Sequence, residues 1–486
     1  MKAKWFFWGL AAIVLARLFS MAVMPLIDTS EPRYAEIARL MAVSGDWITP
    51  WFEPGVPFWG KPPLSFWSQA LGIRILGESE FAVRIPSFLA MAALVALLYR
   101  ATEILVGRDS ARWATLVFST MLLPLAAAGA VLTDSIFALG VTYSMLAFIV
   151  APAKPTLFWR YGFFVGLAIG LLSKGPLTFV LVGIVLVPWL ALRRERVLIL
   201  TKLPWIKGTL LTLALAVPWY VFAELKTPGF VQYFLVGEHF LRFVDAGWRG
   251  DLYGTAHERP LGSIWGEWLL ASFPWGWVGV LLAGWAVSRA SRRVKALQIF
   301  KSPLVGYLAM WALAAPVFFT FSGNILWTYV LPSLPGFALL FTIFGREFVS
   351  EWDESRVRRI SISVGVLVPL TAAFLGLVSL TVPTKLKTEK QLIAAASEYM
   401  TNGEKLYFVH SRPFSARFYS NGQAEVIALD ELKGLAVEKG GAVLLAIPKG
   451  KESALSSDLE DRFEVIYKSR RYTLYRVEGY SFDAPK

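Results

Sequence analysis

Long apolar segments alternate with short polar segments along most of this chain. The apolar segments are about 18–25 residues long, the length at which an α-helix crosses a hydrocarbon core of about 30 Å. The pattern predicts a polytopic all-α membrane protein with about eleven or more transmembrane helices. The predicted spans lie near residues 5–25, 80–100, 111–131, 134–152, 157–173, 176–192, 206–225, 263–287, 303–321, 326–345 and 359–382.

The polar segments fall into two groups by charge. Short segments rich in Lys and Arg, such as 193–202 and 289–301, alternate with two long loops near residues 26–79 and 226–262. An excess of Lys and Arg marks the cytoplasmic loops of membrane proteins, so both long loops are predicted to face outward. The net charge of +13 then reflects membrane orientation, and no nucleic-acid partner is expected.

Regular periodicities also occur outside the spans. Residues 31–43 and 63–76 have apolar positions at helical spacing and predict two outer-face interfacial helices. The tail predicts a small α/β domain, with strands near 404–410, 442–447, 463–468 and 472–477 and short helices near 416–419 and 429–438. We therefore expect a transmembrane catalytic domain over 1–383 and a small soluble domain on the outer face over 384–486.

Composition limits the chemistry that this chain can perform. The sequence is 56% hydrophobic, above the 45–50% or so of a soluble domain, which supports the membrane assignment. It contains no cysteine, and this excludes disulfides, thiol catalysis and Cys-ligated metals. The first apolar run is too long for a signal peptide and lacks a small-residue cleavage site, so we expect it to be retained.

The first outer loop opens with a dense set of ionisable residues. Asp28, Glu31 and Arg33 directly follow the first span, and Tyr34 adjoins Arg33. Sugar transfer from a phosphate donor needs a base for the acceptor and cations for the departing phosphate. Asp28 and Glu31 are candidates for the first role, and Arg33 with Tyr34 for the second. The alternatives are a solvated carboxylate at a helix end and an interfacial arginine.

Three further charged positions lie at span ends or in the outer loops. Lys61 precedes two prolines that stiffen the backbone, and it is a candidate phosphate contact; the prolines alone could mark a helix start. Asp134 lies between two spans, where it is either functional or a helix N-cap. Lys174 lies on the predicted outer side, whereas most Lys and Arg residues lie on the cytoplasmic side. It either contacts a phosphate or extends to the membrane interface.

The second outer loop contains two of the three histidines. His239 lies between Glu238 and Phe240, and His257 precedes another glutamate. Glu238, His239 and His257 are candidate site residues, in which a histidine would either bind a metal or orient a carboxylate. His239 is a weak candidate metal ligand, because an isolated Glu-His pair lacks metal-ligand spacing. No cofactor is certain, and a divalent metal remains a hypothesis.

Taken in order, these segments resemble the GT-C superfamily of membrane glycosyltransferases, of the aminoarabinose transferase and protein O-mannosyltransferase type. The resemblance covers roughly residues 1–345. Its motifs are Asp28 with Glu31-Pro-Arg33-Tyr34-Ala-Glu36, Ser44-Gly45-Asp46-Trp47, Gly60-Lys61-Pro62-Pro63, Phe81-Ala-Val-Arg84-Ile-Pro86, Thr133-Asp134, Ser173-Lys174-Gly175-Pro176, Glu238-His239-Phe240-Leu-Arg242-Phe243, Phe273-Pro274-Trp275 and Tyr329-Val-Leu-Pro332.

The resemblance implies an inverting transfer of a sugar from a polyprenyl monophosphate donor. The reaction would occur on the periplasmic face of the bacterial cytoplasmic membrane, with lipid A or another envelope glycolipid as acceptor. The alternatives are a protein Ser/Thr acceptor and, from another class, a lipid or sugar flippase. By resemblance, Asp28, Glu31 and Asp134 would be the catalytic carboxylates. The donor-phosphate contacts would be Arg33, Tyr34, Lys61, Arg84, Lys174 and Arg242. The cavity that holds the acceptor would include Glu238, His239 and His257.

One position departs from the family pattern. Many aminoarabinose transferases have a glutamate directly before Lys-Pro-Pro, where this chain has Gly60. That carboxylate is associated with a metal in that branch. Metal dependence and the identity of the sugar therefore stay open at this point.

Overall fold

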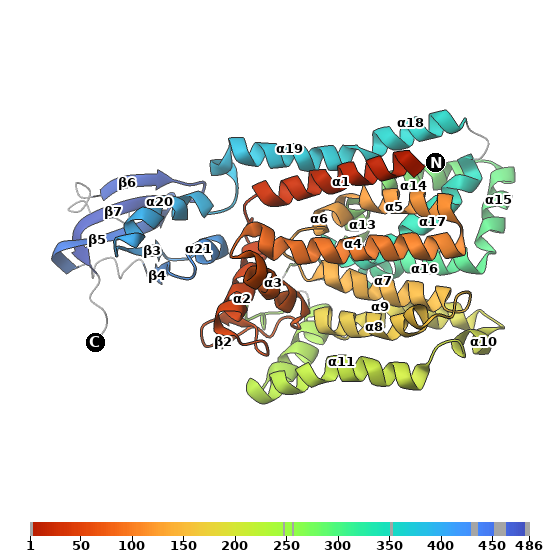
Figure 1. Cartoon of the computed structure of the whole chain (residues 1–486), viewed down its shortest axis with the longest axis horizontal. Coiled ribbons are helices and arrows are strands. Elements are labelled where there is room, and N and C mark those ends of the chain that lie inside the picture. Colours follow the sequence, from red (N-terminus) through yellow and green to blue (C-terminus); the bar gives the residue numbers. More distant parts are fainter. Residues whose placement is uncertain are drawn as a thin grey trace.

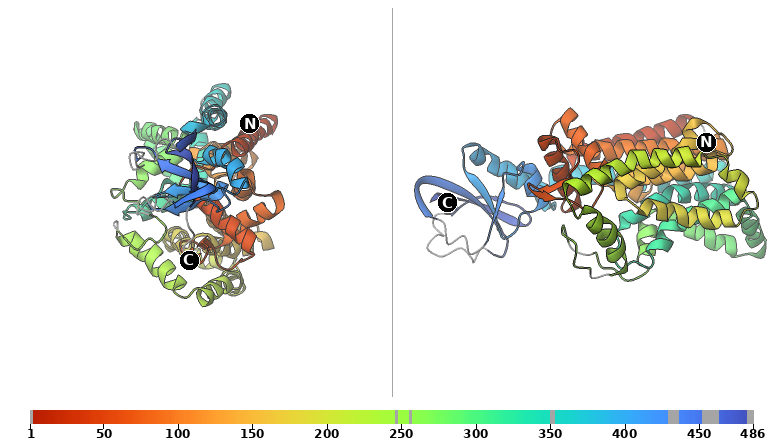
Figure 2. Two further views of the ribbon diagram at one scale, coloured as in Figure 1. Left: turned by 90° about the vertical axis from the view of Figure 1, so that its left-hand side faces the viewer. Right: turned by 90° about the horizontal axis from the view of Figure 1, so that it is seen from below.

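The computed structural model describes residues 3–245, 248–254, 257–349, 353–428, 436–451 and 463–481, and the statements below refer to these ranges. They form an elongated helical body with a sheet domain at one end (Figure 1). Figure 2 shows the same arrangement from two further sides, with the first outer loop next to the sheet domain. The chain begins in the helical body, and α1 (Ala3–Val23) runs towards the sheet domain.

Five helical segments are long and apolar enough to cross a membrane. They are α1, α4 (Glu80–Leu105), α11 (Trp205–Lys226), η2 (Trp327–Ser333) with α17 (Leu334–Val349), and α18 (Glu354–Gly365) with α19 (Leu367–Thr381). Two bent pairs raise the number to seven if each is one span: α13 (Ile264–Ala271) with α14 (Trp275–Val287), and α15 (Ala290–Phe300) with α16 (Pro303–Phe319). The chain is therefore a multi-pass membrane protein, but the predicted count of about eleven spans is not confirmed.

Some apolar runs that the pattern counted as spans are short or interrupted. The run at 111–131 is divided between α5 (Arg108–Ser119) and α6 (Leu122–Ala127). Helix α9 (Leu177–Ala191) has 15 residues and a length of about 22 Å, less than a hydrocarbon core of about 30 Å. Helix α7 (Asp134–Val150) has 17 residues, of which most are buried inside the protein.

Helix α7 packs closely against α8 (Leu157–Lys174) through glycines. A Cβ atom on Gly140 would lie 2.7 Å from the backbone nitrogen of Gly170 and 2.8 Å from the carbonyl oxygen of Gly166. Small residues at such contacts let membrane helices approach backbone to backbone. These two helices hold Asp134 and Lys174 at their ends, so their packing fixes part of the candidate site.

The two helices predicted in the first outer loop are confirmed to within one residue at each end. They are α2 (Ser30–Ser44) and α3 (Leu64–Leu76), and a small hairpin of β1 (Trp51–Glu53) and β2 (Val56–Pro57) connects them. Helix α2 ends at Gly45, which has a positive φ of 71° and donates its N–H to the carbonyl of Met41. This loop lies between the helical body and the sheet domain (Figure 1).

The remaining short elements connect these parts. The second outer loop contains the π-helix η1 (Gln232–Leu241) and the short α12 (Arg242–Val244), which the sequence did not predict. On other connections lie α10 (Arg196–Leu200) and η3 (Pro383–Lys385).

The tail forms a five-stranded mixed sheet in the order β4-β3-β5-β7-β6. Strand β3 is parallel to β4 and β5, whereas β7 is antiparallel to β5 and β6. The elements are α20 (Lys390–Thr401), β3 (Lys405–Val409), α21 (Phe414–Tyr419), β4 (Glu425–Ile427), β5 (Ala436–Pro448), β6 (Phe463–Lys468) and β7 (Tyr472–Ser481).

All four strands predicted in the tail are present, and the short helix near 416–419 falls within α21. The helix predicted at 429–438 is wrong at its end, because β5 begins at Ala436; residues 429–435 lie outside the described residues. The expected division of the chain at residues 383 and 384 stays a prediction.

Opposite charges hold the sheet domain on the first outer loop. The loop and the start of α4 supply the carboxylates, and the tail supplies the cations. The pairs are Arg471–Asp28 at 2.5 Å, Arg417–Glu53 at 2.9 Å, Arg417–Glu36 at 3.5 Å, and Lys390–Glu80. Asp28 and Glu36 are buried, so the pairs that they form are less screened by water than the more exposed pairs of Glu53 and Lys390.

We predict that Gly140→Ala lowers the thermal stability of the purified protein. The added methyl meets backbone atoms of α8 that cannot move aside, and such overpacking destabilises by about 1–3 kcal/mol. Gly183→Ala in α9 is the control, since no atom lies within 4 Å of its added Cβ. Thermal unfolding in detergent should separate the two variants, and equal midpoints would contradict this packing.

Candidate active site

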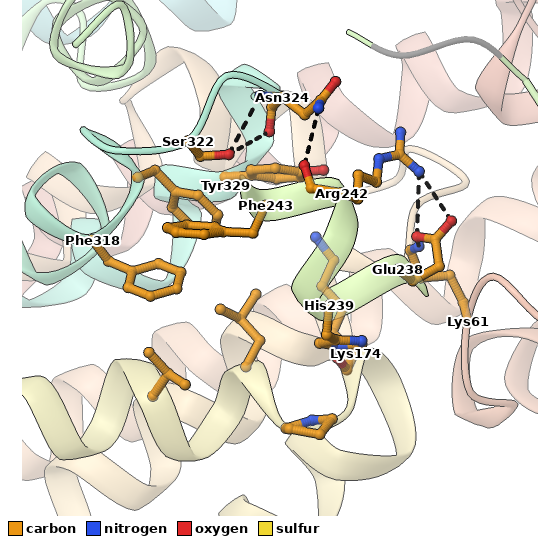
Figure 3. Close-up of a pocket in the computed structure, with 14 residues that line it drawn as sticks. Lys61, Lys174, Glu238, His239, Arg242, Phe243, Phe318, Ser322, Asn324 and Tyr329 are labelled. Atoms are coloured by element: carbon orange, nitrogen blue, oxygen red, sulfur yellow. Dashed lines mark hydrogen bonds and ion pairs between the residues drawn. The ribbon is translucent and has the colours of Figure 1, made fainter. Parts of the chain in front are cut away.

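A pocket of about 170 Å³ lies between the two outer loops and the ends of several membrane helices (Figure 3). Its lining is partly polar and partly apolar. The polar residues are Lys61, Lys174, Glu238, His239, Arg242, Ser322, Asn324 and Tyr329. The apolar residues are Pro176, Leu177, Val180, Phe243, Phe318 and Phe319. The pocket therefore suits a ligand with a charged end and an apolar end.

Glu238 joins two of the cations of this pocket. Its Oε2 accepts from Lys61 Nζ at 3.1 Å, and its Oε1 accepts from Arg242 Nη1 at 3.0 Å. Arg242 Nη1 also lies 3.3 Å from Asp251 Oδ2. Glu238 and Arg242 are four residues apart and lie on the same face of one helical turn in the second outer loop. Lys61 of the first outer loop contacts Glu238 on this face.

These ion pairs keep the groups charged despite their burial. Burial raises the pKa of Glu238, but the positive charges of Lys61 and Arg242 outweigh it and hold this pKa below its ordinary value. Burial likewise lowers the pKa of Lys61, and the negative charge of Glu238 outweighs it and raises this pKa. Both groups are therefore ionised at neutral pH.

The third cation, Lys174, is the last residue of α8. Its Nζ donates to Asp134 Oδ1 at 2.6 Å and lies 4.8 Å from the ring centre of Tyr329. Asp134 is the first residue of α7, so the close packing of the two helices sets this pair. Gly175 follows with a φ of +70°, and a Cβ there would lie 2.7 Å from the ring of Phe234. Glycine thus lets η1 lie against the end of α8.

His239 is held by the backbone on both sides of its ring. Its Nδ1 lies 2.7 Å from the carbonyl oxygen of Phe234, and its Nε2 lies 2.9 Å from that of Lys174. Burial lowers the pKa of His239, which favours a neutral ring that donates to one of the two carbonyls.

The residues of this pocket do not fit a divalent metal. Both ring nitrogens of His239 face carbonyl oxygens, and the carboxylate of Glu238 is engaged by two cations. In the described ranges, no three His, Cys, Asp or Glu side chains are grouped as metal ligands. The geometry gives the His239 metal hypothesis no support, and we derive no step through a metal.

Arg33 lies near this pocket but is not part of its lining. Its Nη1 donates to the carbonyl of Tyr253 at 2.9 Å, and its guanidinium lies over the rings of Tyr34 and Phe414. Its Nε is buried without a hydrogen-bond partner, and no carboxylate of the described residues forms an ion pair with it. His257 is exposed nearby; partial burial and the charges of Arg242 and Arg33 lower its pKa.

Asp28 lies at the contact with the sheet domain, apart from the lining of the pocket. Its Oδ1 accepts from the backbone N–H of Ser415 at 2.9 Å. Its Oδ2 accepts from the Ser415 hydroxyl and from Arg471 Nη2, each at 2.5 Å. The carboxylate therefore joins the first outer loop to α21 and to the start of β7. The role of Asp28 as a base stays a prediction, and these contacts suggest a second role.

Glu31 and Arg84 also lie apart from the pocket, paired with each other. Arg84 Nη2 donates to Glu31 Oε2 at 2.8 Å, and Arg84 also donates to the carbonyls of Met21, Met24 and Pro25 at and just after the end of α1. Burial raises the pKa of Glu31, but the charge of Arg84 outweighs it and lowers this pKa. The geometry thus brings together Lys61, Asp134, Lys174, Glu238, His239 and Arg242, but not Asp28, Glu31 or Arg84.

Two tyrosines that the sequence did not single out support the pocket. Tyr233 donates to Glu238 Oε1 at 3.4 Å. Tyr253 donates its hydroxyl to the carbonyl of Pro57 at 2.7 Å and accepts from the N–H of Trp59 at 2.9 Å. Tyr253 thereby ties the second outer loop to the segment before Lys61. Neither has a charge or a motif spacing that marks it in the sequence.

We predict that the stabilising contribution of Glu238 is lost in acid. Its folded-state pKa is below the ordinary 4.5, so the unfolded state binds more protons as the pH falls through this interval. The contribution is therefore fully present above pH 4.5 and declines below it. The difference in thermal midpoint between the wild type and Glu238→Gln should shrink as the pH falls below 4.5. Glu258→Gln, an exposed change in the same loop, should show no such difference.

Comparisons with known proteins agree with the motifs. Residues 3–234 match the family described as dolichyl-phosphate-mannose-protein mannosyltransferase. The undecaprenyl phosphate-alpha-4-amino-4-deoxy-L-arabinose arabinosyl transferase of Shewanella sediminis is 29% identical over 377 residues, 76% of this chain and 63% of that protein. The corresponding transferase 1 of Sodalis glossinidius is 30% identical over 347 residues, 70% of this chain and 59% of that protein. The chain thus spans less than two thirds of the length of these relatives.

The fold has a solved counterpart. ArnT from Cupriavidus metallidurans, in a crystal structure bound to undecaprenyl phosphate, superposes with a TM-score of 0.77 over 98% of both chains at 18% identity. The apo form of the same protein gives 0.72. At this identity the likeness concerns the fold. Together with the sequence matches, it confirms the resemblance seen in the motifs: this chain is a relative, in sequence and in fold, of the GT-C glycosyltransferases of aminoarabinose transferase type.

Proposed function

We propose that this protein is an inverting glycosyltransferase that uses a polyprenyl monophosphate sugar of the undecaprenyl type as donor. The observation that carries the proposal is the mixed lining of the pocket, in which Lys61, Lys174 and Arg242 share one space with Phe243, Phe318 and Phe319. A phosphate bound by the cations would leave the first apolar units of the lipid against Phe243 and Phe318.

In the proposed reaction, the acceptor oxygen bonds to the anomeric carbon as the bond from that carbon to the phosphate oxygen breaks. The acceptor loses its proton to a base, and the polyprenyl phosphate leaves with the bonding electrons. Negative charge then grows on the phosphate. Lys61 and Arg242 are already held by Glu238, so they can stabilise this charge with little reorganisation.

We further propose that the pocket and the sheet domain face the periplasm from the inner membrane. The basic segments around α10 and α15 lie at the end of the body away from the sheet domain (Figure 1). Positive charge at that end favours a cytoplasmic position. Residues 1–383 would then form the catalytic domain and residues 384–486 the outer domain. A lipid-linked donor suits a site outside the cytoplasmic pool of nucleotide sugars.

For the acceptor we propose lipid A or another envelope glycolipid, because the named relatives are aminoarabinose transferases. The match of residues 3–234 to protein mannosyltransferases favours a protein Ser/Thr acceptor as the second candidate. Mass analysis of lipopolysaccharide and of glycoproteins, from cells with and without this protein, distinguishes the two. A sugar lost only from glycoproteins would overturn the glycolipid assignment.

We predict that Lys61→Ala lowers kcat/KM for the donor by about 10- to 100-fold, as expected for one lost charge-assisted hydrogen bond of about 1.5–3 kcal/mol. The KM for the acceptor should change little. Lys154→Ala, an exposed lysine between α7 and α8, is the matched control. The measurement is transfer in vesicles charged with polyprenyl-phosphate sugar. Equal effects on donor and acceptor would count against a phosphate role for Lys61.

A pair of variants decides how Asp28 contributes to transfer. Asp28→Asn removes the carboxylate, whereas Arg471→Gln leaves it in place and removes its tail partner. Since both oxygens of Asp28 are occupied by the sheet domain, we expect both variants to slow transfer in parallel and to make the tail more sensitive to limited proteolysis. If only Asp28→Asn abolishes transfer and the tail stays resistant, Asp28 is the base.

A further inference from the structure

An arginine lies inside the first membrane helix without an acidic partner. Arg17 of α1 donates from Nε to the carbonyl of Ala128 at 2.5 Å, from Nη2 to the carbonyl of Ala126 at 2.8 Å and from Nη1 to Ser20 Oγ at 3.0 Å. No carboxylate of the described residues forms an ion pair with it. Placing a charged side chain within a membrane-spanning helix costs free energy, and such residues usually have a partner or a function.

Arg17 lines two cavities, both outside the candidate active site. The larger, of about 420 Å³, lies between α1 and α4 over α5 and α6. The smaller, of about 250 Å³, lies between α1, α6 and α19 and reaches Glu31 and Arg84 below the first outer loop. Figure 1 shows α1 lying alongside α19. Neither cavity shares a lining residue with the pocket around Lys61.

The larger cavity has the dimensions of one lipid chain. Its α1 wall runs from Phe6 to Arg17, twelve residues that rise by about 16 Å at 1.5 Å per residue. One leaflet of the hydrocarbon core is about 15 Å deep. The opposite wall contains Ala92 and Ala96, whose small side chains leave the groove open. The groove is therefore about as long as a fatty acyl chain, and it runs from Arg17 past the middle of α1 towards the N-terminal end of this helix.

The end of this groove at Arg17 is suited to bind a negatively charged group. The three contacts of Arg17 use three of the five N–H groups of a guanidinium and supply no negative charge. One N–H on each Nη is left to donate, which matches the oxygens of a phosphate. The smaller cavity beyond Arg17 has room for a headgroup, and the carboxylate of Glu31 that also lines it is already paired with Arg84.

We propose that Arg17 and these two cavities form a binding site for an anionic glycerophospholipid. One acyl chain would fill the groove between α1 and α4, with the phosphate at Arg17 and the headgroup towards the first outer loop. The site is separate from the proposed sugar transfer, and it would hold α1 against α4 and α6.

The test uses the full purified chain with vesicles of equal parts phosphatidylglycerol and phosphatidylethanolamine, followed by native mass spectrometry of the extracted protein. The wild type should retain one phosphatidylglycerol in preference to phosphatidylethanolamine. Arg17→Gln should lower this retention about tenfold or more and remove the preference, as for the loss of a charge-assisted contact. Ala92→Phe should fill the groove and lower retention of both lipids. Leu15→Phe, on the exposed face of α1, is the control and should leave retention unchanged.

Three results would overturn the proposal. The first is equal retention of the two lipids by the wild type. The second is unchanged phosphatidylglycerol retention in Ala92→Phe, a variant that keeps the contacts of Arg17 with α6 and stays informative if Arg17→Gln fails to fold. The third is displacement of phosphatidylglycerol by stoichiometric polyprenyl phosphate, which would assign the groove to the donor lipid. Retention is measured without sugar transfer, so a failure of the proposed enzyme activity leaves this test intact.

Discussion

Charge buried at the edge of a membrane must be neutralised nearby, and this constraint organises the outer end of the molecule. Asp28, Glu36, Asp134 and Glu238 are all withdrawn from water and each meets a cation from a distant part of the chain. An isolated buried charge would be far more costly than a pair. The pairs therefore do more than stabilise single contacts, because they join the first outer loop, the second outer loop and the tail into one layer.

The same constraint gives the pocket its selectivity. Lys61 and Arg242 share one carboxylate, and a neutral ligand would gain little binding free energy from them. An anion must either compete with Glu238 or accept the hydrogen bonds that Glu238 leaves free. A phosphate with several oxygens can do so, because it offers more acceptors than a carboxylate. Lys174 is held separately by Asp134 and points to the same space, which spreads the positive charge over two helices and two loops.

The sequence predicted local structure well and long-range pairing poorly, for physical reasons. The 3.6-residue period of α2 and α3 is set by neighbours in the chain, so both helices were predicted to within one residue at each end. The partner of Asp28 lies 443 residues away, and no periodicity or spacing reports such a contact. Hydropathy also cannot tell a lipid-facing helix from one buried in protein. Most residues of helix α7 are buried among other helices, so its apolar sequence does not by itself show that it spans the membrane.

The glycine before Lys61 shows how a local change and a long-range pair depend on each other. A Cβ on Gly60 would lie 2.9 Å from the ring of Phe58. That ring is buried and packs 4.6 Å from the ring centre of Tyr253, so it has little freedom to move. A glutamate at position 60 would therefore displace the aromatic contact that joins the two outer loops. Here the carboxylate beside Lys61 comes instead from Glu238 of the second loop. The neutralisation of Lys61 thus depends on the docking of the second outer loop. The carboxylate of Glu238 pairs with two cations, Lys61 and Arg242, rather than with a metal.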